Sequence, residues 1–198
     1  GLVLPPAVAP IQAIVVPVAQ HKEGVLEKAN ELTERLKKVC RAKIDDSDNS
    51  PGWKFAEYEM KGVPVRVEIG PKDIEKNQCV VVTRHNREKT FVSLDDIETV
   101  ILEKLEEVRQ GLYDSALENR ERRTYVAKTL DDITKQLEEH GDGFVKAMWC
   151  GSEECEEKVK EITGVGSRCI PLEQENLSDT CVCCGKPAKT MVYWGKAY

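Results

Sequence analysis

Two kinds of apolar periodicity alternate along the first half of the chain. Residues 11–18 (IQAIVVPV) and 78–83 (QCVVVT) are short, nearly continuous apolar runs, which are typical of strands covered on both faces of a sheet. Residues 23–40 carry apolar positions at spacings of three and four, which predicts an amphipathic helix, and a short strand is expected at 41–44. This alternation of strands and helices predicts a compact α/β domain with a mixed sheet.

The middle of this domain carries dense local signals. Residues 50–52 (SPG) predict a turn, and a helix is expected over 53–61, ended by the glycine that follows. In residues 63–69 valine and isoleucine alternate with proline, arginine and glutamate, which is the pattern of a half-buried strand. We therefore expect Arg66 and Glu68 on a polar face or edge of this helix–strand unit.

The second half of the chain is more strongly charged. Ser93 is expected to cap a long helix, whose pattern continues to residue 140 with a break near Thr124. Residues 144–149 have the composition of a strand. The predicted organisation is a proline-rich linker at 1–10, an α/β domain with five short strands at 11–110, and a second, α+β domain at 111–198.

Composition restricts the function only in part. Charged residues make up 32% and hydrophobic residues 40%, as in ordinary soluble globular proteins, and we expect no membrane span and no export signal. The net charge of −6 argues against a nucleic-acid partner, yet between residues 51 and 90 eight Lys/Arg outnumber six Asp/Glu, which leaves −8 elsewhere. Because affinity for phosphates depends on the local patch, one mildly basic face is compatible with binding an RNA loop.

Five of the eight cysteines form two tight groups, Cys150 with Cys155, and Cys181 with Cys183 and Cys184 in CVCCGK. Thiolates in two short-spaced groups suit metal binding in a reducing cytosol better than a disulfide framework. Tetrahedral zinc takes four thiolates and then has no open position, so the metal is expected to be structural. We predict zinc ligation by Cys150, Cys155, Cys181 and Cys184, with Cys183 as the alternative fourth ligand.

No catalytic constellation is evident in the sequence. His21, His85 and His140 lie in polar surroundings without a partner at a recognisable spacing, and there is no phosphate-binding glycine loop. The three remaining cysteines lie in or beside apolar segments and are expected to be core residues: Cys40, Cys79 and Cys169.

The motif SPGWKF, followed by E-x-x-G-V-P-V-R-V-E-I-G-P-K-D, resembles the C-terminal part of prolyl-tRNA synthetases of the eukaryote-like, archaeal type. The opening GLVLPP, the paired cysteines and the final Tyr198 extend the resemblance along essentially the whole chain. It implies a class II synthetase anticodon-binding domain with a five-stranded mixed sheet and helices, followed by a small α+β zinc-binding domain.

The resemblance also implies an enzymatic context. The family joins proline to its tRNA with ATP and Mg²⁺ in a catalytic domain expected upstream of Gly1, so this fragment alone is expected to be inactive. The expected partners are the anticodon loop of proline tRNA, the catalytic domain and, in the full-length enzyme, a second copy of the chain. The expected location is the cytoplasm, and Tyr198 is expected near the active site.

The same resemblance places an anticodon-reading surface on the helix–strand unit. Proline anticodons carry guanine at the second and third positions. A carboxylate can accept from guanine N1–H and N2–H₂, whereas Arg or Lys can donate to O6 and N7, and aromatic side chains can stack on splayed bases. The candidate residues are Glu59, Arg66, Lys72, Lys89, Trp53 and Phe55.

Two other interpretations make different predictions. A stand-alone zinc-ribbon adaptor for RNA or protein partners would show no dependence on guanine. A small α/β enzyme that uses the turn at residues 70–73 (GPKD) would have a pocket lined by acid–base groups near Lys72.

Overall fold

The computed structural model describes residues 1–197, and Tyr198, expected near an active site, lies outside the described residues. The chain divides into two compact units, an N-terminal unit (Gly1–Ser115) and a C-terminal unit (Ala116–Tyr198). The division falls within helix α4 (Ile97–Arg122), so the domain boundary expected near residue 110 also lies inside this helix. Within the described residues, no helix combines the length and the apolar character needed to cross a membrane.

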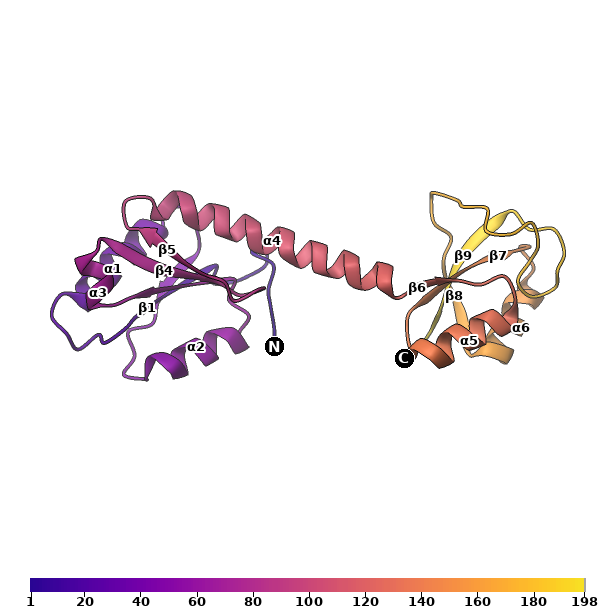
Figure 1. The fold of residues 1–198 in the computed structure, drawn as a ribbon, viewed down its shortest axis with the longest axis horizontal. Coiled ribbons are helices and arrows are strands. Elements are labelled where there is room, and N and C mark those ends of the chain that lie inside the picture. The colour runs from indigo at the N-terminus through magenta and orange to yellow at the C-terminus, as the bar shows by residue number, and fades with distance from the viewer. Residues whose placement is uncertain (198) are drawn as a thin grey trace. The chain divides into compact units, whose positions relative to one another are not determined.

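The N-terminal unit is built on a five-stranded mixed sheet with the order β2-β1-β3-β4-β5 (Figure 1). Strand β1 pairs in parallel with β2 and with the central strand β3, whereas β3, β4 and β5 are antiparallel neighbours. This confirms the mixed sheet predicted from the apolar runs. The strands are β1 (Ala13–Pro17), β2 (Ala42–Ile44), β3 (Val65–Ile69), β4 (Gln78–Thr83) and β5 (Lys89–Ser93).

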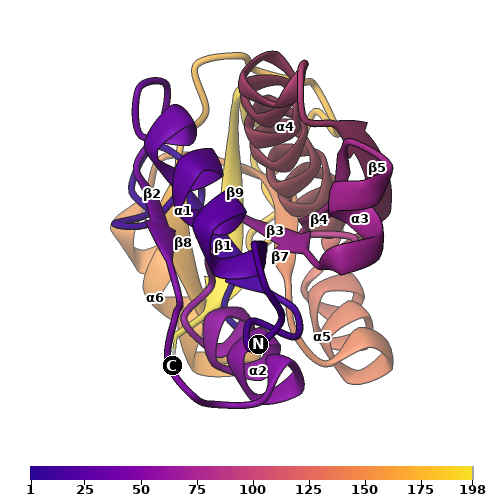
Figure 2. The ribbon, with the colours of Figure 1, turned by 90° about the vertical axis from the view of Figure 1, so that its left-hand side faces the viewer.

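Helices cover both faces of this sheet (Figures 1 and 2). On one face α1 (Val25–Leu36) and α4 pack on the apolar side of β3, together with the short helix α3 (Pro71–Glu75). On the other face α2 (Pro51–Met60) packs through Tyr58 against Ile14 of β1. The loops that follow β1 and β2 and the short helix α3 therefore share the carboxyl edge of the three parallel strands.

Strand β3 differs from the half-buried strand that the sequence pattern predicted. All five of its residues are buried, because β1 and β4 flank it and helices lie over both faces. Arg66 and Glu68 are each only 9% exposed. The expectation of an accessible polar face was wrong for these two residues, and Arg66 lies against Phe55 and Glu59 of α2.

Two further segments differ from expectation. Ser93 ends β5, and its hydroxyl accepts from the backbone N–H of Asp95, so it caps a turn that precedes the start of α4 at Ile97. The expected N-terminal linker packs onto the unit, since the Arg41 guanidinium donates to backbone carbonyls of residues 6, 7 and 9. Tertiary hydrogen bonds therefore order a segment whose prolines alone indicated only an extended chain.

The C-terminal unit is a four-stranded sheet with the order β6-β7-β9-β8, packed against two helices. The predicted helix break near Thr124 is confirmed, because β6 begins there. The predicted strand at 144–149 is confirmed as β7, and its Val145 packs with Val159 of α6 and Trp194 of β9. The elements are β6 (Thr124–Val126), α5 (Leu130–His140), β7 (Phe144–Trp149), α6 (Glu153–Thr163), β8 (Val165–Cys169) and β9 (Thr190–Lys196).

Candidate metal centre and nucleic-acid interface

Three segments of the C-terminal unit bring four cysteine side chains together. Cys150 follows the last residue of β7, and Cys155 lies in the first turn of α6. Cys181 and Cys184 belong to a tight knuckle in which the N–H of Gly185 donates to the carbonyl of Cys181 at 3.0 Å. Gly185 has a φ of 70°, a left-handed conformation that glycine adopts without strain.

The geometry of this cluster fits a tetrahedral metal. The four sulfur atoms all lie within 4.8 Å of one another, with Cys150 Sγ 3.6 Å from Cys155 Sγ and 3.8 Å from Cys184 Sγ. Four thiolates about 2.3 Å from a tetrahedral zinc would lie about 3.8 Å apart. The cluster is therefore compatible with a metal ion held by the four cysteines that the spacing predicted.

The thiols of the cluster differ in their ease of ionisation. The pKa of Cys184 is lowered to about 7, chiefly because the backbone N–H of Lys186 donates to its sulfur. Burial raises the pKa of Cys155. Thiolates are the metal-binding form, and of these two thiols Cys184 ionises more readily.

The other cysteines lie outside this cluster. Cys183, the alternative fourth ligand, packs against the apolar cores of the C-terminal unit. Cys79 is buried in the N-terminal core, and Cys40 packs at its edge. The expectation for Cys169 was wrong, because its side chain is exposed on β8.

A row of alternating charges crosses the sheet face that α2 partly covers. Arg66 Nη1 is 3.2 Å from Glu59 Oε1, and its Nη2 is 2.9 Å from Glu68 Oε1. Glu68 Oε2 is in turn 3.8 Å from the ammonium of Lys89, and Glu59 Oε2 is 3.6 Å from the guanidinium of Arg87. We call these five side chains the charged row. The structure thus brings together Glu59, Arg66 and Lys89 of the candidate anticodon residues.

Aromatic rings lie beside the charged row. The Arg66 guanidinium is 4.0 Å from the centre of the Phe55 ring, which is a cation–π contact. Phe91 stands two residues after Lys89 on β5, so both point to the same face, and 68% of its surface is exposed. Sequence reasoning missed Phe91 and Arg87. For Phe91 a signal was available, because an aromatic residue at i+2 from a candidate cation on a strand shares its face.

The structure places the other two candidates elsewhere on the N-terminal unit. Lys72 is exposed on α3, after the carboxyl end of β3, and among residues 1–197 no ion pair joins it to the charged row. Trp53 lies in the first turn of α2 and is 50% exposed, so it is not a core residue. Both belong to the edge of the sheet where the parallel strands end.

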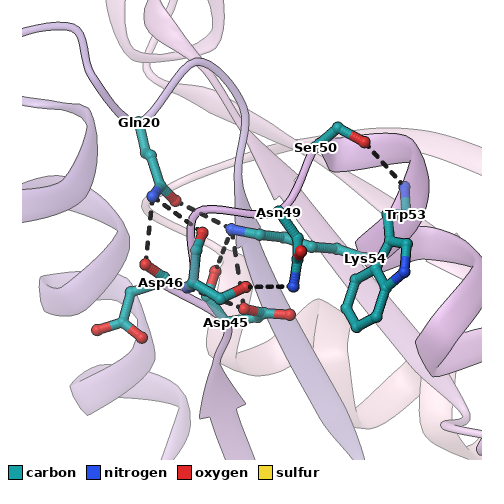
Figure 3. Close-up of polar contacts among 8 residues, drawn as sticks. Gln20, Asp45, Asp46, Asn49, Ser50, Trp53 and Lys54 are labelled. Carbon is teal, nitrogen blue, oxygen red and sulfur yellow. Dashed lines mark hydrogen bonds and ion pairs between the residues drawn. The ribbon is translucent and has the colours of Figure 1, made fainter.

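A buried lysine anchors this edge (Figure 3). Lys54 is 1% exposed, and its ammonium donates to the carbonyl of Asp45 at 2.9 Å and to Gln20 Oε1 at 3.0 Å. The Gln20 amide donates in turn to the carbonyls of Asp46 and Ser47. These bonds tie the loop after β1 to the loop after β2 and so hold the start of α2.

The pKa values of two groups near Lys54 are shifted from their usual values. Burial acts to raise the pKa of Asp45, but hydrogen bonds from Ser47 and the charge of Lys54 outweigh it, so the pKa lies below its usual value. The pKa of Tyr58 is raised to about 12 by burial and by the negative charge of Asp45. Asp45 is therefore ionised and Tyr58 neutral at physiological pH.

Comparison with known families divides the chain as the structure does. Residues 12–104 match the family described as "Anticodon binding domain". Residues 130–198 match the family described as "Prolyl-tRNA synthetase, C-terminal". The two matches fall on opposite sides of the division within α4.

Similar proteins occur in clostridia and their relatives. The chain is 63% identical over 198 residues to a proline–tRNA ligase of Ruminiclostridium cellulolyticum, 61% to one of Clostridium botulinum and 60% to one of Clostridium novyi. Each alignment covers the whole chain but 41% of the relative's length. These organisms are bacteria, so the comparison does not support the assignment to a eukaryote-like, archaeal type.

Proposed function

We propose that the chain reads the guanines of the proline anticodon, because residues 12–104 match the anticodon-binding domain family and residues 130–198 match the C-terminal domain family of prolyl-tRNA synthetases. The charged row is the observation that carries the proposal. It presents carboxylates and cations alternately on one sheet face, beside the aromatic rings of Phe55 and Phe91. Recognition of two splayed guanines needs all three kinds of group.

Within the row, Glu59 is the proposed guanine acceptor. Its side chain is 32% exposed, whereas that of Glu68 is 12% exposed and is held by Arg66. The contact from Arg87 to Glu59 is 3.6 Å long and comes from a side chain that is 69% exposed, so guanine can take its place. Arg66 then orients the Glu59 carboxylate from below, and Lys89 supplies a donor for O6 or N7.

Exchange of Glu59 tests the proposal. A base-specific bidentate contact contributes about 1–3 kcal/mol of discrimination, so Glu59→Ala should weaken binding to the proline anticodon stem-loop and flatten its preference for guanine. Glu59→Gln should be nearly as harmful, because its amide turns a donor toward the guanine donors. The measurement is titration of each variant with stem-loops that carry guanine or adenine at the second and third anticodon positions.

Glu57→Ala is the matched control, since Glu57 lies on the same helix but pairs with Lys61 at 2.6 Å, outside the charged row. It should leave the guanine preference unchanged. An undiminished preference in Glu59→Ala would assign the recognition to other residues. Absence of any guanine preference in the unaltered chain would favour the zinc-ribbon adaptor.

Lys72 and Trp53 have a different proposed part. They lie at the edge where the parallel strands end, apart from the charged row, so we assign them contacts to flanking nucleotides or phosphates. Lys72→Ala should then lower affinity and the salt dependence of binding without changing the guanine preference.

The cysteine cluster is proposed to hold one structural zinc, bound by Cys150, Cys155, Cys181 and Cys184. Zinc would join the end of β7, the start of α6 and the knuckle at residues 181–185, which supplies cross-links that a small sheet needs. Four protein ligands leave no coordination position for a substrate.

For the whole protein we propose proline–tRNA ligase activity, in which ATP, proline and tRNA give prolyl-tRNA, AMP and diphosphate. The chain spans 41% of the length of the relatives it matches. ATP and Mg²⁺ would act in a catalytic domain outside the present sequence. A homodimeric enzyme in the cytoplasm, with Tyr198 near its active site, also stays a prediction.

A further inference from the structure

A basic groove in the C-terminal unit has no role in either site described above. It has a volume of about 870 Å³ and lies where the end of α4, the start of β7 and the end of β9 meet. Four cationic side chains line it: Arg120, Arg123, Arg168 and Lys196. None belongs to the cysteine cluster or to the charged row.

The charge of the groove is largely uncompensated. Asp142 is the only acidic residue among the described groove residues, and it pairs with Arg123 at 3.0 Å. In residues 1–197, no carboxylate lies within 4.0 Å of the charged nitrogens of Arg120, Arg168 or Lys196. The glutamates of α6 line a neighbouring hollow, which shares Arg168 and Ala197 with the groove, and one of them, Glu156, accepts from Ser167. In a chain of net charge −6, this concentration of cations indicates an anionic ligand.

At the floor of the groove two side chains pack closely on Gly195. A Cβ at this position would lie 3.3 Å from Phe144 Cδ1 and 3.4 Å from Arg168 Nε, so a larger residue would crowd both. Arg168 is held over the floor because its guanidinium donates to the Gly195 carbonyl at 2.8 Å. Phe144 is 39% exposed and packs edge-to-face on Tyr193, with ring centres 6.3 Å apart. The groove thus combines fixed cations with one accessible aromatic ring.

We propose that this groove is a second RNA-binding surface, which takes the phosphate backbone of the tRNA without reading its sequence. Arginine suits phosphate because its planar guanidinium can donate two hydrogen bonds at once, and an exposed ring can stack on a base or ribose. Uncompensated cations release counterions from RNA when they bind it. The proposal rests on the proposed function only for the identity of the RNA.

The test removes two groove charges that have no structural partner in the described residues. Arg120→Gln combined with Lys196→Gln should weaken binding of the full chain both to a proline tRNA transcript and to an RNA duplex of unrelated sequence. Loss of two phosphate contacts lowers the slope of log K against log salt by about 1.4–1.8. Between about 50 and 200 mM salt, the unaltered chain should therefore lose roughly tenfold more affinity than the variant.

A matched variant removes the same charge elsewhere in the C-terminal unit. Lys135 and Lys158 are exposed and lie outside the groove, so Lys135→Gln with Lys158→Gln should change neither the affinity nor the slope. Equal effects of the two double variants would overturn the proposal, as would an unchanged slope in the groove variant.

Two further measurements separate RNA from other anions. Inorganic pyrophosphate should not displace the RNA duplex at equimolar concentration, and if it did the groove would be a site for small phosphates. A groove variant that binds RNA normally but lowers charging by the full-length enzyme would assign the groove to a protein contact. Both results would refute RNA binding here. Guanine preference is measured separately with Glu59→Ala. The proposal that the charged row reads guanine and the proposal that the groove binds RNA can therefore fail independently.

Discussion

At the scale of single residues, the N-terminal unit buries charge only where a partner receives it. Arg66 lies between two carboxylates and a phenyl ring, and Lys54 lies between a backbone carbonyl, an amide and Asp45. When a buried charge loses its partner, the cost of its desolvation is no longer offset. Contacts to buried charges therefore affect the stability of the fold more than exposed ion pairs do. Lys54 is the clearest case, because its bonds hold the loops that precede α2.

Replacing Lys54 by methionine keeps the volume of the side chain and removes its charge. The change leaves the Asp45 carboxylate, 9% exposed, without its cation and removes the donor from the buried Asp45 carbonyl and from Gln20 Oε1. We expect a loss of about 3 kcal/mol in the free energy of unfolding, measured by urea denaturation of the whole chain. Lys54→Met with Asp45→Asn should recover part of the loss, because the unpaired charge is then gone.

Lys61→Met is the control for this prediction. Lys61 is the C-cap residue of the same helix, is 53% exposed and pairs with Glu57 one turn away. Its loss should change stability by no more than about 0.5 kcal/mol. Equal effects at the two lysines would show that the Lys54 contacts do not stabilise the unit.

At the scale of elements, the turn between β4 and β5 packs against α4. The His85 ring packs so closely on Gly111 that a Cβ there would lie 2.4 Å from its Cδ2 atom. The same turn carries Arg84, which donates to the carbonyl of Glu59, and Arg87, which pairs with the Glu59 carboxylate. Helix α4 therefore supports the turn that contacts the proposed guanine acceptor.

Gly111→Ala tests this contact. In an unobstructed helix, alanine would be favoured over glycine by about 1 kcal/mol. Here we expect a destabilisation of about 1–3 kcal/mol, because the methyl group must displace the His85 ring. In a His85→Ala background the same change should become stabilising, which a double-mutant cycle of unfolding free energies would measure.

Gly52 supplies the comparison, since no atom lies within 4 Å of a Cβ built on it in α2. Gly52→Ala should be neutral or stabilising. If Gly111→Ala were also neutral or stabilising, the β4–β5 turn would not pack against α4 as the His85–Gly111 contact indicates.

At the scale of the whole molecule, the two units differ in the size of their apolar cores. The N-terminal unit has a large apolar core between its sheet and helices α1 and α4, whereas the C-terminal unit divides its apolar side chains between two smaller clusters. One of these clusters contains Cys155 and Cys181. Structural zinc contributes about 10 kcal/mol in small domains, which is comparable with the entire stability of a unit of this size.

Removal of the proposed zinc should consequently destabilise the C-terminal unit only. Chelation, or Cys155→Ser, should raise amide hydrogen exchange across β7, α6 and β9 while β1, β3 and β4 keep their protection. Elemental analysis should find one zinc per chain. Cys169→Ser is the control, because Cys169 is exposed and lies outside the cluster. Equal protection with and without metal would contradict a structural zinc.

The amino-acid sequence by itself determined the features that depend on neighbours along the chain. Apolar runs located β1 and β4, because a strand buried on both faces needs continuous apolar residues, and strand-like composition located β7. Spacing indicated Cys150, Cys155, Cys181 and Cys184, since metal ligands come in short-spaced pairs, and these are the sulfur atoms that the structure brings together. Motif resemblance located the anticodon-binding unit that the family comparison then matched.

Only the tertiary structure decided which charges are buried and which candidates meet. Alternation in residues 63–69 could not reveal that Arg66 and Glu68 would be buried, because a strand's own pattern does not show what packs on its polar side. The separation of Lys72 from Glu59, the exposure of Phe91 and the groove formed by α4, β7 and β9 likewise depend on segments far apart in the sequence. Local periodicity reports one element's preference for burial, whereas a site is made by the packing of several elements.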